Sequence, residues 1–139
     1  MYLNIKADTK ISDIKKQFSD VYPFLKIEFF KRPHPKNKLS AEMDRIVVDK
    51  PIALLTKKNI DAQIDIAGKR TVMMLEQDFW DFFGLSVQVF RKALNMWIET
   101  SFTDNWTLES QNSEGKMFSS NDFGEKTDGK FENRNVDLE

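Results

Sequence analysis

Residue types that commonly carry catalysis are scarce in this chain. Its 139 residues include no cysteine and one histidine, His34, which stands between two prolines in a polar stretch. Without cysteine there is no thiolate nucleophile, no disulfide framework and no zinc–thiolate site. A catalytic triad would have to use His34, and a catalytic zinc ion usually needs two or three histidines. We therefore expect no catalytic residue, no metal and no cofactor, and favour a protein that is not an enzyme.

Carboxylates are plentiful but show no spacing that requires catalysis. Asp78 and Asp81 are three residues apart on an expected helix, so they are neighbours on the face opposite Phe79. A solvated helix face explains such a pair, whereas acid–base chemistry would need burial.

The sequence Gly68-Lys69-Arg70-Thr71 is a candidate anion site. A strand is expected before it and a helix after it. Free backbone N–H groups, the helix dipole and two cations would then meet at one point, where a phosphate or carboxylate could bind. The alternative is a tight turn followed by an ordinary Thr71 cap, and we rank that reading first.

Aromatic and lysine residues recur at alternate positions of the expected strands. If the aliphatic residues of those strands face the helices, the opposite sheet face carries the candidate interaction surface: Tyr2, Phe30, Phe90, Lys92 and Trp97. Such a face fits a protein partner or a homodimer, and it could also be covered by the chain itself. Nucleic acid ranks lower, because no RNA-recognition motif accompanies the aromatics.

The elements that would position these residues follow from hydrophobic spacing. Leu94-Asn95 is expected as a two-residue turn that pairs Lys92 with Trp97, although leucine does not suit a positive φ. Asp8 or Thr9 is expected to cap the first helix, which ends around Tyr22. Gly84 is expected to end the second helix. The expected strands are 2–6, 25–30, 62–66, 85–92 and 96–100, and the expected helices are about 10–22, 72–83 and 108–113.

This order of elements predicts an α+β fold. Two β-α-β halves and an extra hairpin strand fit a two-layer, ferredoxin-like β-α-β/β-α-β-β sandwich, with ubiquitin-like or other α+β folds as alternatives. A long irregular connection is expected at about 31–59, with an edge strand near 45–48.

Charge is divided unevenly along the chain. The total is −1, but residues 1–102 sum to +4 and residues 103–139 to −5. We expect one domain over residues 1–115 and an acidic, disordered tail over 116–139. No apolar run is long enough to span a membrane and no signal peptide precedes the first strand, so we expect a cytoplasmic protein without membrane contact.

Two segments resemble known sequences. The stretch at 83–112, which includes Phe-Gly-Leu-Ser-Val-Gln-Val-Phe-Arg-Lys and Asp-Asn-Trp-Thr-Leu-Glu-Ser-Gln-Asn, resembles small uncharacterised bacterial proteins, and 11–30 is also similar. The resemblance implies a bacterial origin and assigns no activity and no binding residues.

Overall fold

The computed structural model describes residues 1–32, 42–58 and 61–119. Within them the chain forms three α-helices and five strands. The helices are α1 (Ile11–Val21), α2 (Val72–Phe83) and α3 (Leu108–Ser119). The strands are β1 (Tyr2–Ile5), β2 (Leu25–Phe30), β3 (Ala62–Asp65), β4 (Ser86–Ala93) and β5 (Met96–Glu99).

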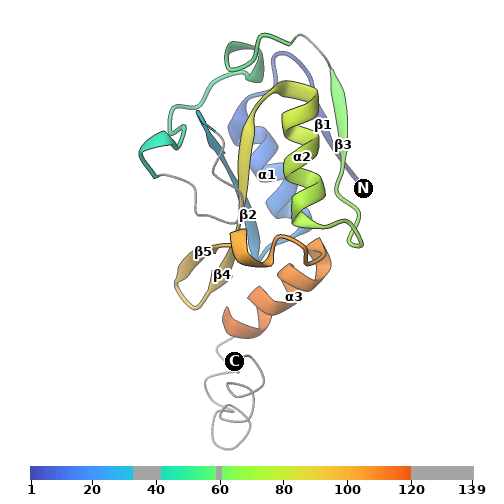
Figure 1. The fold of residues 1–139 in the computed structure, drawn as a ribbon, viewed down its shortest axis with the longest axis vertical. Helices are drawn as coiled ribbons and strands as arrows, with labels where there is room; N and C mark the ends of the chain where they lie inside the picture. Colours follow the sequence, from blue (N-terminus) through green and yellow to red (C-terminus); the bar gives the residue numbers. More distant parts are fainter. Residues whose placement is uncertain (33–41, 59–60, 120–139) are drawn as a thin grey trace, which may run out of the picture.

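The described strands form two antiparallel sheets. β1 pairs with β3, and a separate sheet has the order β2-β4-β5. Figure 1 shows α2 near the centre of the view, with β1 and β3 at its right, β2 and β4 at its left, and α3 below.

One hydrophobic core joins both sheets to the helices. Leu3 and Ile64 contribute from the smaller sheet, and Phe18 contributes from α1. Phe29 of β2 meets Phe79 of α2 edge to face, with ring centroids 5.7 Å apart. The aliphatic side chains of β2 and β4 therefore face the helices, as their alternation predicts.

The mixed α+β class is confirmed, but its ferredoxin-like detail is not. That arrangement would bring the strands of both β-α-β halves into one sheet. Here β1 and β2 belong to different sheets, and each pairs with an antiparallel strand from the second β-α-β half, β3 for β1 and β4 for β2.

Local signals place α2 and the β4–β5 hairpin correctly. The Thr71 hydroxyl accepts a hydrogen bond from the Met74 N–H, and Gly84 ends α2 in the left-handed conformation with φ 65°. Leu94 and Asn95 form the two-residue turn, and Leu94 adopts the positive φ, 57°, that its branched side chain disfavours.

Other boundaries depend on distant residues. The N-cap of α1 is Lys10 rather than Asp8 or Thr9, and the Asp49 carboxylate accepts from the Ser12 N–H at 3.0 Å. Around the expected edge strand at 45–48, the structure has a single bridge between Arg45 and Phe30 and two short 3₁₀ helices nearby, Glu42–Asp44 and Ile52–Leu54.

α3 is twice as long as expected. It continues through Gly115 to Ser119, so residues 116–119 are helical and not part of a tail. Gly115 is buried where a Cβ would lie 2.9 Å from Cβ of Phe24 and 3.1 Å from Cγ of Arg91. Close packing on β4 therefore extends the helix beyond the glycine. The predicted disorder of the remaining segment falls on 120–139, outside the described residues.

Candidate functional site

The outer face of the β2-β4-β5 sheet, turned away from the helices, gathers most of the predicted interaction surface. We use the name outer face for the surface formed by Lys26, Phe90, Lys92 and Trp97. Lys26 stands opposite Phe90, and Lys92 stands opposite Trp97 across the hairpin. The predicted Lys92–Trp97 pairing is thus present.

Lys26 joins the two rings of the outer face. Its Nζ lies 5.3 Å from the centroid of the Phe90 ring and 5.1 Å from that of Trp97. Each contact of this kind contributes about 0.5–1 kcal/mol at an exposed position. The ammonium therefore holds an aromatic pair from two strands in one arrangement.

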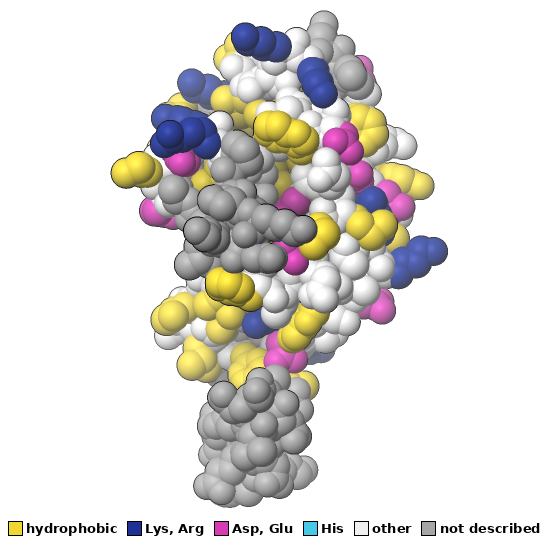
Figure 2. All heavy atoms as spheres, viewed as in Figure 1, with side chains coloured by type: hydrophobic (Ala, Val, Ile, Leu, Met, Phe, Trp, Pro, Cys, Tyr) yellow, Lys and Arg dark blue, Asp and Glu magenta, His cyan; other side chains and the backbone are white. Residues whose placement is uncertain are grey.

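The hairpin adds exposed apolar side chains beside the outer face. Trp97 is 38% exposed, Met96 63% and Leu94 68%. Figure 2 shows hydrophobic side chains gathered at the lower left of the view, over this hairpin. Large apolar groups clustered at a surface commonly mark a contact site.

Tyr2 and Phe30 do not extend this surface. Tyr2 belongs to β1, in the other sheet, and is 55% exposed there. Phe30 has the side-chain phase of Lys26 on β2 but is only 2% exposed. Of the five predicted residues, Phe90, Lys92 and Trp97 come together.

A charge cluster beside the outer face was missed by sequence reasoning. Glu28 is 6% exposed, with carboxylate oxygens 2.7 Å from Lys15 Nζ, 3.2 Å from Lys26 Nζ and 3.5 Å from a guanidinium nitrogen of Arg45. Burial acts to raise the pKa of Glu28, but hydrogen bonds and charges from Lys15 and Lys26 outweigh it and leave that pKa below its ordinary value. The ion pair with Glu28, two residues along β2, therefore helps to hold Lys26 in its place on the outer face.

The Gly68–Thr71 segment is occupied by the chain itself. The Val72 and Met73 N–H groups of α2 donate to the backbone oxygens of Trp106 and Asp104, at 3.1 and 2.8 Å. The Gly68 and Arg70 carbonyls accept from the first residues of α3. The N–H groups of the first turn of α2, which would hold an anion, are thus already bonded.

The two cations of that segment are placed differently. The Arg70 guanidinium donates to the Asp65 carbonyl and to the Asp78 carboxylate, and its side chain is only 15% exposed. Lys69 is exposed. Arg70 therefore ties β3 to α2, and one lysine is left at the surface.

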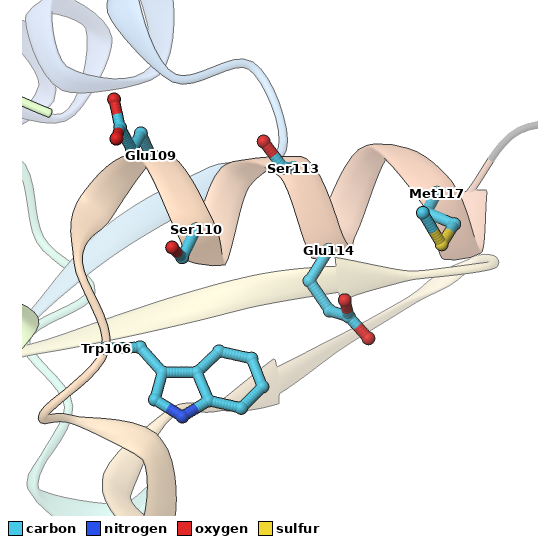
Figure 3. Close-up of a pocket in the computed structure, with 6 residues that line it drawn as sticks. All are labelled: Trp106, Glu109, Ser110, Ser113, Glu114 and Met117. Carbon is cyan, nitrogen blue, oxygen red and sulfur yellow. The ribbon is translucent and has the colours of Figure 1, made fainter. Parts of the chain in front are cut away.

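A groove lies along α3. The groove, of about 600 Å³, is lined by Trp106, Glu109, Ser110, Ser113, Glu114 and Met117. Figure 3 shows Ser110 and Glu114 on the side of the helix that faces the Trp106 ring. Behind that ring the Arg91 guanidinium lies 5.4 Å from its centroid and donates to Gln111 at 2.7 Å. Burial lowers the pKa of Arg91, against a raising effect of the Glu114 charge. These contacts anchor α3 to β4.

No catalytic arrangement is seen among the described residues. His34 lies outside them. Asp78 is paired with Arg70, and the Asp81 carboxylate accepts from the Gln77 amide at 2.8 Å. Within residues 1–32, 42–58 and 61–119 no cluster of three acidic or histidine side chains could hold a metal ion.

The chain is thus a mixed α+β protein whose described surface carries an aromatic–lysine sheet face. Comparisons with known proteins find no family model, no curated protein and no solved structure that matches it. No helix in the part of the chain that the structure describes is long and apolar enough to cross a membrane.

Proposed function

We propose that this protein is a non-catalytic interaction module that binds a protein partner through the outer face. The observation that carries the proposal is the Lys26 ammonium shared by the Phe90 and Trp97 rings. A partner would find apolar rings and a cation already ordered, so little side-chain entropy would be lost on binding. Exposed tryptophan is also enriched among the residues that dominate binding energy.

Two partners fit this face, a different protein and a second copy of this chain, and the test below distinguishes them. We place the module in a bacterial cytoplasm, on the resemblance of residues 11–30 and 83–112.

The test replaces Trp97, an aromatic residue of the outer face, by a charged residue in the full chain. Trp97→Lys is expected to abolish partner retention in a pull-down or, for a homodimer, to halve the mass in light scattering. Trp80→Lys is the matched control, because Trp80 is 46% exposed on α2. Unchanged mass and unchanged retention for Trp97→Lys would overturn the proposal.

Binding of nucleic acid or a phosphate ligand is the second candidate. Lys69 and Lys92 favour it, while the bonded donors at the start of α2 weigh against it. The basic loop at 31–38 lies mostly outside the described residues. A titration with RNA, DNA and nucleotides at low salt tests this candidate, since such binding weakens steeply with added salt. A flat response removes it.

A further inference from the structure

The end of α3 lies at the turn of the β4–β5 hairpin, at the edge of the sheet that carries the outer face. The Leu94 N–H, in the hairpin turn, donates to the Phe118 carbonyl at 2.9 Å, and α3 ends one residue later at Ser119. The remaining 20 residues, 120–139, therefore begin at the hairpin that carries Trp97.

The composition of that segment complements the outer face. Residues 120–139 contain six carboxylate and three cationic side chains, a net charge of −3, together with Phe123 and Phe131. The face offers Lys26, Lys92 and two aromatic rings. Two carboxylates lie there as well: Glu28, which pairs with Lys15 and Lys26, and Glu99, which stands opposite Phe90. The three lysines outnumber these two carboxylates, so the local net charge is positive. Opposite charge would draw the segment in, and aromatic contact would hold it.

Tethering makes even a weak contact effective. For comparison, 20 residues of random coil in general span about 25 Å root-mean-square, which exceeds the distance across a three-stranded sheet. A segment attached this close acts at an effective concentration in the millimolar range. Contact within one molecule would therefore prevail over the same contact between molecules in dilute solution.

We infer that residues 120–139 dock on the outer face of their own chain and compete there with the partner. The inference rests on the proposed function, because it assigns to the same face a resident competitor. The partner that displaces the segment would be acidic and carry aromatic side chains, since it meets the same lysines and rings.

The absence of cysteine allows a direct test on the full chain. Asn133→Cys, labelled with a nitroxide, is compared with its reduced, diamagnetic form by NMR. The label is expected to weaken the Phe90, Lys92 and Trp97 signals at least threefold more than those of Tyr2 and Trp80. The contrast should shrink in 0.5 M salt and with Lys92→Glu, because both weaken the attraction.

Two outcomes would overturn the inference. One is equal weakening over the whole surface, or none. The other is equally strong weakening in a mixture where labelled and observed chains are different molecules, which would assign the contact to a second copy.

The two proposals fail in different ways. If the label leaves the outer face untouched while Trp97→Lys still abolishes partner retention, docking of the segment is wrong and the interaction module stands. If the label marks the face while Trp97→Lys retains its partner, docking stands and the proposed function is wrong.

Discussion

Two regions of this protein carry cations in a setting typical of binding sites, and the structure treats them in opposite ways. At the start of α2, Arg70 is bonded to Asp65 and Asp78, and the helix N–H groups are bonded to the chain before α3. On the outer face, Lys26 also pairs with a carboxylate, that of Glu28, but it rests on two aromatic rings beside exposed apolar side chains. The first region holds the fold together, whereas the second leaves aromatic and apolar side chains partly exposed at the surface.

The difference shows that a cation in a typical binding-site setting can instead be used within the fold, and that residue type alone does not decide which. A helix start attracts anions only while its N–H groups lack partners. Here the turns before α3 supply backbone oxygens to those groups. These acceptor oxygens belong to residues more than 30 positions away in sequence, so the bonds could not be predicted from the sequence.

The largest change in stability is expected on replacing Arg70, which tests whether the first region is structural. Arg70→Ala should lower the free energy of unfolding by about 2–3 kcal/mol, because it leaves Asp78 without its charged partner. Urea unfolding measures this loss. Lys69→Ala, at an exposed neighbouring position, should change stability by less than about 0.5 kcal/mol. If Arg70→Ala left stability intact but removed phosphate binding, the region would be a ligand site after all.

The packing of α3 gives the next effect. Gly115→Ala should destabilise the protein by about 1–2 kcal/mol, although alanine favours helix, because the added Cβ would meet Phe24 and Arg91. Ser113→Ala on the exposed side of α3 is the control and should be neutral or slightly stabilising. Midpoints of thermal unfolding report both. A stabilising Gly115→Ala would mean that α3 does not pack closely on β4, which would also remove the contact between Phe118 and the hairpin.

Acid sharpens the comparison at Glu28, beside the outer face. The folded-state pKa of Glu28 lies below its ordinary value of 4.5, so its stabilising contribution is present above that pH and is lost as the pH falls through the lower, folded-state pKa. The free energy of unfolding of Glu28→Gln should therefore fall less steeply below pH 4.5 than that of the unmodified protein. Asp20→Asn, which removes a 62% exposed partner of Lys16, is the control and should keep the steep acid limb. If the stability of Glu28→Gln and of the unmodified protein fell equally steeply with acid, the ion pairs of Glu28 would not contribute to stability.

The smallest effect concerns the hairpin turn. Leu94→Gly should raise stability by about 0.5 kcal/mol, because relief of a positive φ slightly exceeds the cost of glycine's freedom in the unfolded chain. Asn95→Gly, where no positive φ needs relief, should lower stability by a similar amount. Denaturant midpoints distinguish the two. A loss of stability with Leu94→Gly would show that the leucine side chain packs on the hairpin more than its exposure implies.

The sequence predicted features that depend on neighbouring residues. Thr71 and Gly84 mark the ends of α2, and alternation sets the phase of β4 against β5. It could not predict which strands pair, because β1 and β2 alternate alike and their partners lie about 60 residues away.

The predicted site is divided for the same reason. Phe90, Lys92 and Trp97 share one hairpin, so their grouping follows from local register. Tyr2 was placed with them on the assumption that β1 and β2 share a sheet, which they do not. Phe30 alternates with the same side of β2 as Lys26, but its side chain is buried. The Glu28 cluster draws on α1, β2 and residue 45, and no spacing rule joins those three.

The hydrogen bond between Leu94 and Phe118 has a mechanical consequence. Tension on the C-terminal end of the chain would enter the described fold through the last turn of α3 and reach the hairpin through that bond. Gln111, Trp106 and Arg91 would resist the pull further along the helix. A load there would peel α3 from its last turn inward and release the hairpin turn before it strained the core around Phe79.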